Sequence, residues 1–310
     1  MYSLIIPIYK NEESIRELVK TIGKLDIKLD GKLEAVFVID GSPDQSFTIL
    51  NELLPQQKFA SQLILLSRNF GSFTAVRAGL AEGRGPFFAV MAADLQEPPE
   101  LIIKFFRLLE SEDIDITIGV REGRSDPFLS KVFSGIFWFL YRKLVQPEMP
   151  SGGVDIFGCN STVRDHLLAL NEANTSLVGL LFWLGFRRKF VGYQRITRQH
   201  GKSAWTFKKR TNYLVNSTLA FSDLPIWILT IIGGVGLLVS FFLGLAVIIY
   251  RIFTAAPVPG YAATILAVLT FGALNCFGLG IIGAYVWRIF ENTKGRPQGI
   301  ILSTKEFGRR

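Results

Sequence analysis

The residue best placed to do chemistry in this sequence is Asp94, which follows the apolar run 87–91 and precedes Pro98, Pro99 and Glu100. A carboxylate just past the C-terminal end of a buried strand lies where open α/β sheets hold their ligands. A hard metal ion that bridges phosphate groups needs such a carboxylate. An Asp in front of Pro-Pro-Glu is equally suited to cap the start of a helix. This stretch alone leaves both interpretations open, and the elements around it must decide between them.

Strand-like and helix-like segments alternate through the first 120 residues. The segments that predict strands are 3–8, 34–39, 62–67, 87–91 and 114–120, and those that predict helices are 12–23, 45–54, 72–82 and 99–110. This alternation is typical of an α/β domain with a mostly parallel sheet and helices on both faces. Such a sheet brings the loops after its strands to one edge, so we expect the loops 9–11, 40–44 and 92–96 to lie together there.

The next part of the chain has a mixed character. Residues 127–145 carry apolar and aromatic side chains at helical spacing with basic residues among them. They predict either a core helix or a helix lying in a membrane interface, and the aromatic bulk with basic ends favours the interface. Residues 203–223 predict a second amphipathic helix next to the membrane. Between the two we expect a strand over 152–157, helices over 161–170 and 177–184, and a strand over 189–196.

Hydrophobic residues make up 49% of the 310-residue chain, and they are concentrated after residue 224. The segments 224–250 and 252–287 contain no charged residue. A membrane-spanning helix needs about 20 apolar residues. Within a membrane part at 224–288, the sequence therefore predicts two transmembrane helices, at about 225–250 and 261–287.

Charged residues around these helices set the expected orientation. The loop between the helices has no charge, and the basic residues that flank the pair are Lys208, Lys209, Arg210, Arg288, Lys294, Arg296, Arg309 and Arg310. The positive-inside rule then places both a domain at 1–202 and a C-terminal tail at 289–310 in the cytosol. We expect an integral protein of the cell membrane with two spans.

The net charge of +8 suits either a nucleic-acid-binding protein or a protein held against an anionic membrane leaflet. Because the cations flank the predicted spans, we favour the membrane and expect no nucleic-acid partner. Cys159 and Cys276 are isolated and form neither a disulfide framework nor a metal-ligand pattern. The short apolar run at the N-terminus lacks a basic region before it, so we expect no signal peptide. Glycines in both predicted spans would allow close helix packing or contacts within a homo-oligomer.

Several motifs occur in an order that resembles the family 2 glycosyltransferases. They are Pro7-Ile8-Tyr9, VIDGSPD at 38–44, SRNFG at 67–71, AADLQ at 92–96 with Pro98-Pro99-Glu100, and RQHGKS at 198–203. The likeness is greatest to the polyprenyl-phosphate glycosyltransferases, the group that holds dolichyl-phosphate mannose synthase and the bacterial undecaprenyl-phosphate glucosyltransferases. The resemblance implies a nucleotide-sugar-binding domain of GT-A type, a nucleotide-diphosphate sugar as donor, and a polyprenyl phosphate as acceptor.

The resemblance also implies roles for residues at the predicted sheet edge. Tyr9 would lie against the nucleobase, Asp40 would accept hydrogen bonds from the base or ribose, and Arg68 would brace its loop or approach the diphosphate. Asp94 would hold Mg²⁺ or Mn²⁺ against the donor phosphates, with Gln96 as a neighbouring or outer ligand. The expected donor site comprises Pro7, Tyr9, Asn11, Asp40, Arg68, Asp94 and Gln96.

Two positions depart from the pattern of that family. The family usually carries an acid where Ala92 stands, and often a Glu where Asn11 stands. Mg²⁺ is often bound by one or two carboxylates together with phosphates and waters. We therefore expect weaker metal binding rather than an inactive enzyme.

The acceptor side of the reaction has its own candidate residues. The resemblance places a catalytic base at Asp155, which could instead be a structural carboxylate paired with an arginine. The second pKa of a phosphate monoester is about 6, so a base need only orient the acceptor or remove a residual proton. Two cationic clusters could bind the acceptor phosphate, and the second could instead clamp the donor diphosphate. Their residues are Arg121, Arg124, Lys131 and Ser134 in the first cluster, and Arg198, His200 and Lys202 in the second.

Together these features and the resemblance predict a metal-dependent transfer of a hexose to a polyprenyl phosphate at the cytosolic membrane face, and the resemblance implies that the transfer is inverting. The resemblance implies glucose from UDP-glucose and undecaprenyl phosphate as acceptor. Alternatives are another sugar, namely mannose, an N-acetylhexosamine or aminoarabinose. A processive polysaccharide synthase is disfavoured because such enzymes usually carry more spans. A non-catalytic membrane scaffold with a degenerate donor site is supported only by Ala92.

Overall fold

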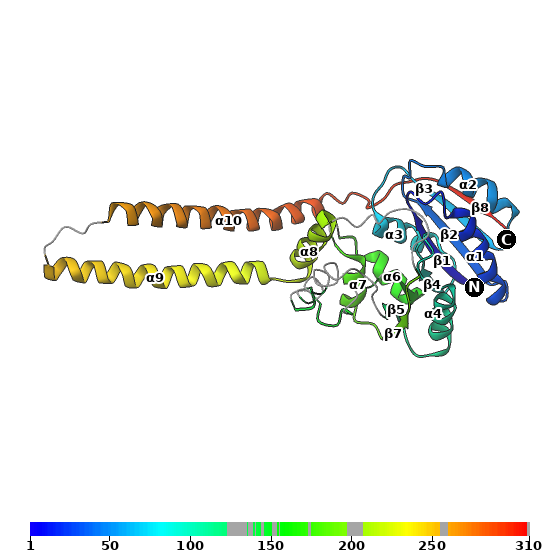
Figure 1. Cartoon of the computed structure of the whole chain (residues 1–310), viewed down its shortest axis with the longest axis horizontal. Coiled ribbons are helices and arrows are strands. Elements are labelled where there is room, and N and C mark those ends of the chain that lie inside the picture. The colour runs from blue at the N-terminus through cyan, green and yellow to red at the C-terminus, as the bar shows by residue number, and fades with distance from the viewer. Residues whose placement is uncertain are drawn as a thin grey trace.

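The computed structural model combines a globular α/β part with two long helices that extend away from it (Figure 1). It describes residues 1–122, 135, 139, 141–143, 146–150, 154, 156–172, 175–196, 207–254 and 260–308. Both ends of the chain lie in the globular part, so the segment after the second long helix returns to the sheet (Figure 1).

The globular part is built on one sheet of eight strands in the order β7-β5-β6-β4-β1-β2-β3-β8. The pairs β1–β2, β1–β4, β2–β3 and β5–β7 are parallel, whereas β3–β8, β4–β6 and β5–β6 are antiparallel. The sheet is therefore mostly parallel, which confirms the predicted α/β architecture. The strands are β1 (Tyr2–Ile8), β2 (Leu33–Ile39), β3 (Ala60–Leu66), β4 (Phe87–Val90), β5 (Ile116–Arg121), β6 (Phe157–Asn160), β7 (Arg188–Tyr193) and β8 (Ile301–Phe307).

Helices cover both faces of the sheet because its central strands are apolar on both sides. In β1, Leu4, Ile6 and Ile8 pack into one core, whereas Ile5 between them packs into the other. The first core is covered by α1 (Ile15–Lys28), α2 (Ser46–Leu53), the short 3₁₀ helix η1 (Leu54–Gln56) and α4 (Pro99–Ser111). The second is covered by α3 (Ser72–Glu82), α6 (Ser161–Ala169), α7 (Leu177–Trp183) and part of α8 (Phe207–Phe221).

Every strand and helix predicted before residue 121 is present, α3 over the predicted range and the others with shifted ends. Of the strand predicted over 152–157, residues 152, 153 and 155 lie outside the described residues. β6 begins at Phe157, the last residue of that range, and continues to Asn160. Asn160 then caps α6, because its side-chain oxygen accepts a 3.0 Å hydrogen bond from the Val163 backbone N–H. The strand therefore lies directly against the following helix. Of the predicted helix 127–145, residues 135, 139 and 141–143 are helical, and the others lie outside the described residues.

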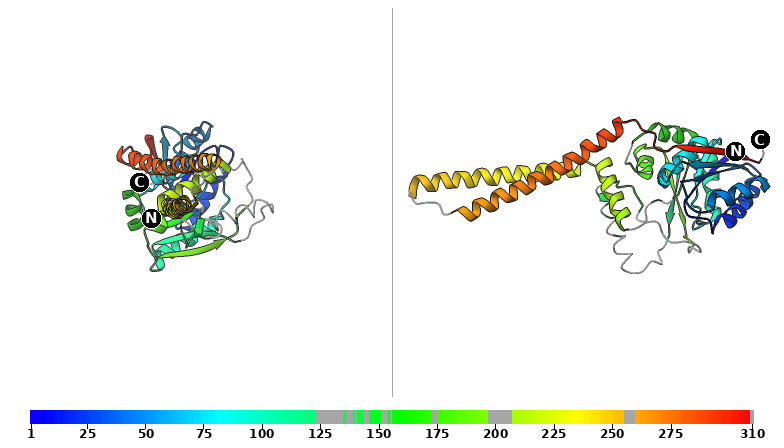
Figure 2. Two further views of the ribbon diagram at one scale, coloured as in Figure 1. Left: turned by 90° about the vertical axis from the view of Figure 1, so that its left-hand side faces the viewer. Right: turned by 90° about the horizontal axis from the view of Figure 1, so that it is seen from above.

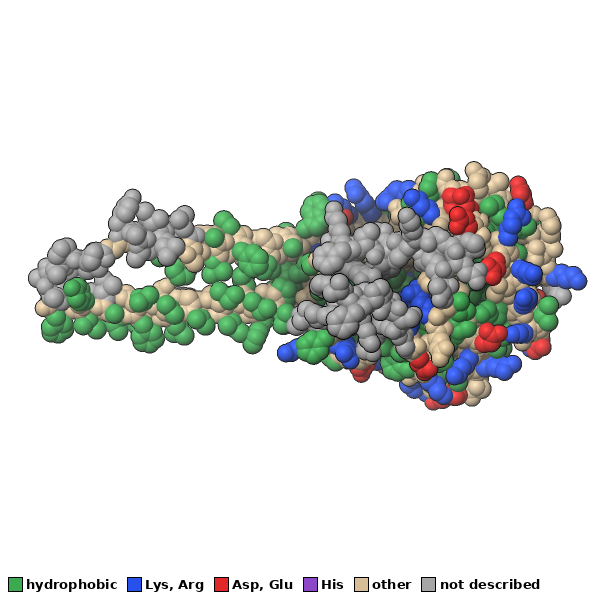
Figure 3. Space-filling model, in the orientation of Figure 1, with side chains coloured by type: hydrophobic (Ala, Val, Ile, Leu, Met, Phe, Trp, Pro, Cys, Tyr) green, Lys and Arg blue, Asp and Glu red, His purple; other side chains and the backbone are tan. Residues whose placement is uncertain are grey.

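The two long helices are α9 (Leu224–Thr254) and α10 (Tyr261–Thr293), and both are long and apolar enough to cross a membrane. Both extend from the globular part, contact each other and cross at an angle when seen from above (Figures 1 and 2). Apolar side chains line the visible face of both helices, and charged side chains begin at the globular part (Figure 3). In the 18-residue apolar windows of the candidate spans Leu224–Tyr250 and Thr270–Thr293, 0% and 6% of the residues are buried, so the described part of the chain does not enclose either helix.

The segment after α10 is more than the simple tail that the sequence suggested. Residues 301–307 form β8, which adds an antiparallel strand at the β3 edge of the sheet. Apolar and polar side chains do not alternate regularly along β8. The sequence therefore lacks the pattern that predicts a strand there.

Candidate active site

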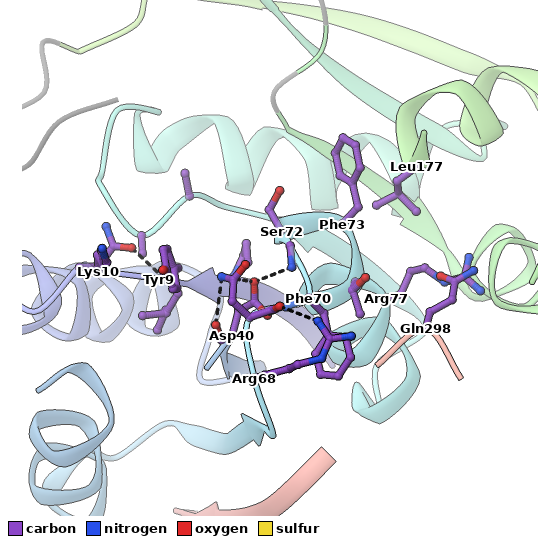
Figure 4. Close-up of a pocket in the computed structure, with 18 of the residues that line it drawn as sticks. Tyr9, Lys10, Asp40, Arg68, Phe70, Ser72, Phe73, Arg77, Leu177 and Gln298 are labelled. Atoms are coloured by element: carbon purple, nitrogen blue, oxygen red, sulfur yellow. Dashed lines mark hydrogen bonds between the residues drawn. The ribbon is translucent and has the colours of Figure 1, made fainter. Parts of the chain in front are cut away.

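One large cavity of about 1520 Å³ lies at the carboxyl ends of the parallel strands. The loops that follow β1, β2, β3 and β4 contribute Tyr9, Asp40, Arg68 and Asp94 to its wall. The predicted meeting of the loops 9–11, 40–44 and 92–96 at one sheet edge is therefore confirmed. Figure 4 shows the cavity running from Tyr9 and Lys10 at one end to Leu177 and Gln298 at the other.

The loop after β1 presents Tyr9 to the cavity, with 38% of its surface exposed. The Asn11 side-chain oxygen accepts a 3.2 Å hydrogen bond from the Tyr9 backbone N–H. Lys10 adopts a left-handed backbone conformation with φ of 56°, and its N–H donates to Ser42 Oγ at 2.8 Å. The turn thus directs an exposed aromatic ring into the cavity and ties this loop to the one after β2. Pro7, at the end of β1, also lines the cavity.

Asp44 and Glu12 lock the loops after β1 and β2 together. The Glu12 backbone N–H donates to Asp44 at 3.1 Å, and the Gln45 N–H donates to the Glu12 carboxylate at 2.8 Å. Partial burial acts to raise the pKa of Asp44, but hydrogen bonds from Ser42 and Ser46 outweigh it and lower the pKa below its ordinary value. Asp44 therefore stays ionised and holds the turn.

Asp40 is only 2% exposed, and its carboxylate binds the loop after β3. Its Oδ1 accepts a 2.7 Å hydrogen bond from the Phe70 N–H, and its Oδ2 accepts from the Gly71 N–H at 2.9 Å and from the Asn69 amide at 3.0 Å (Figure 4). Burial raises the pKa of Asp40, while these backbone donors and the nearby Arg68 act to lower it. Most of the acceptor capacity of this carboxylate is thus used within the protein, which makes Asp40 a clasp for the loop.

The approach of the two loops depends on glycine at position 41. Gly41 has φ of +56°, and a Cβ atom there would lie 2.2 Å from the Arg68 carbonyl carbon. Only glycine fits at this point. Arg68 itself stacks over the Phe70 ring at 3.9 Å and donates a hydrogen bond to the Asn69 carbonyl. The Arg68 side chain is exposed at the cavity wall, where it both braces its loop and offers positive charge.

Asp94 lines the cavity in the loop after β4, beside Ala92 and Ala93. Ser14 Oγ holds this loop by donating to the Ala93 carbonyl at 2.9 Å. The described residues contain no group of three or more His, Cys, Asp or Glu that could hold a metal on their own. A single cavity-facing carboxylate does fit Mg²⁺ or Mn²⁺ when phosphate oxygens and waters supply the other ligands.

Gln96 lies next to this loop but faces a different partner. It is 8% exposed, and its side-chain oxygen accepts a hydrogen bond from the Arg195 guanidinium. Its backbone carbonyl accepts a 2.9 Å bond from the Ile196 N–H. In this arrangement Gln96 connects the Asp94 loop to the segment after β7, and its role as a metal ligand stays a prediction.

The predicted acceptor residues are only partly described. Arg121 ends β5 and is absent from the cavity lining in the described part of the chain. The remaining candidates lie outside the described residues, and they are Arg124, Lys131, Ser134, Asp155, Arg198, His200 and Lys202. Their roles stay predictions.

Sequence reasoning missed the wall of the cavity that faces the long helices. This wall is formed by Arg77 of α3, the segment before α7, α8, the end of α10 and the segment after it. It carries the buried hydroxyl oxygen of Thr175, which has no hydrogen-bond partner among the described residues. The Arg77 guanidinium donates to the carbonyls of Leu167 and Leu168 at 2.7 and 3.0 Å. No local motif marks these residues, because the fold assembles them from distant segments.

Comparison with known proteins places these observations in a family. The family described as Glycosyl transferase family 2 matches residues 3–169. The chain is 30% identical to a bactoprenol glucosyl transferase of Shigella phage SfX, covering 98% of this chain and 99% of that protein. It is also 30% identical to an uncharacterized glycosyltransferase, sll0501, of Synechocystis, covering 95% and 92% of the two chains.

A prophage-derived bactoprenol glucosyl transferase of Shigella flexneri is likewise 30% identical, with 96% of each chain covered. Among solved structures, S. aureus TarS in complex with UDP-GlcNAc aligns with a TM-score of 0.48 and 16% identity, covering 72% of this chain and 67% of that one. This last likeness is too low to assign a ligand or a residue role in this chain.

Proposed function

The chain belongs to glycosyltransferase family 2, and on that premise we propose that it transfers glucose from UDP-glucose to a polyprenyl phosphate at a membrane surface. The observation that carries this proposal is the composition of the cavity wall. One cavity is lined both by the loops with Tyr9, Asp40 and Asp94 and by residues at the base of the two candidate membrane helices, including Asn216 and Glu291. A water-soluble donor and a lipid-anchored acceptor can meet in such a place. The bactoprenol glucosyl transferases to which the chain is similar make glucose and a polyprenyl acceptor the first choices.

The donor would bind along the carboxyl edge of the sheet. The exposed Tyr9 ring offers a flat apolar face for the uracil base, with Pro7 beside it and Asn11 fixing the turn. Arg68 offers positive charge at the same wall. Asp40 would act indirectly, by holding the loop 68–71 in place for the donor. Its carboxylate already accepts three hydrogen bonds, so it can accept at most one more from the ribose or base.

Asp94 is the residue that would hold a divalent ion, Mg²⁺ or Mn²⁺, together with the donor phosphates. When bound, such an ion neutralises charge that develops on the departing diphosphate. The Ala92 methyl group lines the cavity where a second acid would stand in the family pattern. This chain would therefore depend more on the donor phosphates for metal binding than a relative with two acids.

The acceptor phosphate would attack the anomeric carbon of glucose directly. A phosphate monoester is mostly ionised near neutral pH, so its oxygen is already a nucleophile. Direct displacement inverts the anomeric centre and yields a β-linked lipid sugar from an α-linked donor. We propose Asp155 as the group that orients the acceptor or takes a residual proton. The cations proposed to bind the acceptor phosphate are Arg121, Arg124, Lys131, Arg198, His200 and Lys202, with Ser134 as a further donor.

We further propose that α9 and α10 cross the cell membrane, with the globular part and the C-terminal segment both in the cytosol. Basic residues flank the pair of helices at the globular end, and the positive-inside rule favours this orientation. The donor is then available from the cytosolic pool.

A sugar panel tests the proposal. The purified full-length protein in lipid nanodiscs is incubated with Mg²⁺, a C55 polyprenyl phosphate and one radiolabelled nucleotide sugar at a time. We expect label from UDP-glucose in the lipid extract, and less from UDP-N-acetylglucosamine or GDP-mannose. A greater yield from another sugar would replace glucose in the proposal. Absence of lipid label from every sugar, with no UDP-sugar binding, would favour the scaffold alternative.

A further inference from the structure

The segment that follows α10 contributes directly to the cavity. We call residues 295–300 the C-terminal strap, because they connect the second candidate membrane helix to the edge strand β8. Gln298 in the strap and Glu291 near the end of α10 both line the cavity. Figure 4 shows Gln298 at the end of the cavity opposite Tyr9, close to Arg77. The segment after the second long helix therefore forms part of the wall of the site.

The strap is joined to the start of the loop that Asp40 clasps. The Ile300 carbonyl accepts a 2.9 Å hydrogen bond from the Ser67 N–H. Immediately beyond it, Ile301 of β8 pairs with Leu66 at the end of β3. The chain then enters 68–71, which contains the donors to Asp40. The loop is thus fixed on one side by Asp40 and at its start by the strap.

Two further contacts hold the strap against the cavity wall. The Gln298 side-chain amide donates a 2.8 Å hydrogen bond to the Glu172 carbonyl. At Gly299, a Cβ atom would lie 2.7 Å from Thr74 Cγ2 in the first turn of α3. The absence of a side chain at 299 therefore lets the strap lie directly on the helix that starts beside the loop. Any larger residue there must displace the Thr74 side chain or the strap.

We propose that the C-terminal strap is a positioning element for the nucleotide-sugar donor, with Gln298 and Gly299 as its positioning residues. This inference rests on the proposed function, since it assigns the loop 68–71 to donor binding. Loops are among the least stable parts of a fold, and their order depends on the few contacts that anchor them. Loss of the strap contacts increases the number of conformations of the loop. The donor must then restore order when it binds, and its affinity falls.

The same segment links donor binding to the membrane part of the chain, because the strap follows α10 after Lys294 without another element between them.

β8 is held at its far end by different contacts, namely a 2.7 Å hydrogen bond from Lys305 to Asn51 and an ion pair between Glu306 and Arg84. Neither residue of β8 lines the cavity in the described part of the chain. Lys305→Ala therefore gives a matched control that weakens the anchoring of β8 but leaves the strap contacts intact.

The test compares Gln298→Met, Gln298→Lys, Gly299→Val and Lys305→Ala in the full-length protein in nanodiscs. Gln298→Met removes the donor at similar volume, and Gln298→Lys restores a donor. The first readout is the Kd for UDP-glucose and its KM and kcat. The second is hydrogen–deuterium exchange of the amides of residues 68–71 without ligand, which reports order in the loop. Thermal unfolding identifies a variant that is simply unfolded.

We expect Gln298→Met to raise the donor Kd and KM roughly two- to tenfold, the effect of one lost hydrogen bond. Gly299→Val raises both as well, because its side chain overlaps Thr74 and displaces the strap. Exchange at Phe70 and Gly71 becomes faster, and kcat at saturating donor stays within about twofold. Gln298→Lys recovers part of the affinity, and Lys305→Ala matches the wild type. If folded Gln298→Met shows unchanged exchange and unchanged donor affinity, the inference about the strap is wrong, but the proposed function still stands. Absence of UDP-glucose binding by the wild type would overturn the proposed function itself.

Discussion

The Oδ1 atom of Asp40 accepts a 2.7 Å hydrogen bond from the backbone N–H of Phe70, which lies 30 residues further along the chain. This contact joins the loop after β2 to the loop after β3 at the point where both enter the cavity. A buried carboxylate that accepts backbone N–H groups is a stronger acceptor than a neutral side chain. The cavity wall near Arg68 is therefore held in place without a bound ligand.

Replacement of Asp40 by alanine leaves the Phe70, Gly71 and Asn69 donors without their acceptor. These donors are only partly buried or exposed, so water can replace part of the lost bonding, and the cost is about 1–3 kcal/mol in total. We expect Asp40→Ala to unfold at a lower temperature than the wild type and to bind UDP-glucose at least tenfold more weakly. Thermal unfolding and calorimetric titration measure the two effects, with Asp113→Ala as the control for loss of an exposed carboxylate. Normal donor affinity in Asp40→Ala would show that donor binding does not depend on the hydrogen bonds from the loop 68–71 to Asp40.

Tyr9 tests the proposed position of the nucleobase. Stacking of a base on an aromatic side chain contributes roughly 1–3 kcal/mol. We expect Tyr9→Ala to weaken UDP binding by a factor of roughly 5 to 100, while Tyr9→Phe keeps most of the affinity because it retains the ring. Titration of UDP, rather than UDP-glucose, isolates the nucleotide part of the donor. If Tyr9→Ala binds UDP as well as the wild type, the base lies elsewhere.

Ala92 offers a gain-of-function test of the metal site. A second carboxylate beside Asp94 adds negative charge where a divalent ion is proposed to bind. We expect Ala92→Asp to lower the Mg²⁺ concentration for half-maximal transfer by roughly three- to tenfold, because each carboxylate ligand strengthens the attraction for the cation. Ala92→Ser, which adds a hydroxyl without charge, should remain close to the wild type. An unchanged or increased Mg²⁺ requirement in Ala92→Asp would count against metal binding at this loop.

Asp115 provides a pH-dependent test of how β5, β6 and β7 are held together. Its carboxylate accepts hydrogen bonds from Asn160 at 3.0 Å and from the Arg187 side chain at 3.1 Å, which ties β5 to β6 and to the start of β7. Burial acts to raise the pKa of Asp115, but these partners outweigh it and lower the pKa below its ordinary value. A carboxyl with a lowered folded-state pKa stabilises the fold above its unfolded pKa of about 3.9 and loses this effect as the pH falls through the folded-state value.

We therefore expect Asp115→Asn to be less stable than the wild type at pH 7, by about 1 kcal/mol. The difference in thermal unfolding midpoint should shrink as the pH falls below about 4, because the wild-type carboxyl then becomes protonated as well. A difference that is equally large at pH 3 and pH 7 would show that the charge of Asp115 plays no part.

The sequence was informative about the sheet edge because its signals there are local. Apolar strands end in turn residues such as Asp40-Gly41-Ser42, and strand–helix alternation dictates that these ends lie together. The same signals predicted α9 and α10 from uncharged runs. What local signals cannot give is which side chain meets which backbone group. Asp40 was expected to face the donor, and its main partners are instead the amides of the next loop.

The contacts between segments far apart in the chain could not be predicted from the sequence for a related reason. Lys305 of β8 contacts Asn51, which lies 254 residues earlier, and the Gln298 contact with Glu172 spans 126 residues. No periodicity or motif encodes contacts at such separations. The end of β6 also depends on a specific contact, because Asn160 caps the following helix and so decides where the strand stops.

The rate of glucose transfer by Asp94→Asn is the most direct test of the central claim, which is a metal-assisted reaction at the Asp94 loop. Asn keeps the shape of the side chain and removes its charge. Purified wild type and variant in nanodiscs receive UDP-[¹⁴C]glucose, undecaprenyl phosphate and Mg²⁺, and the labelled lipid is counted after extraction. Thermal unfolding of both proteins confirms that the variant is folded. We predict Mg²⁺-dependent labelling of the lipid by the wild type and a loss of at least a hundredfold in Asp94→Asn. Retained transfer by the folded variant, or labelling that persists in EDTA, would contradict a metal-assisted reaction at this loop.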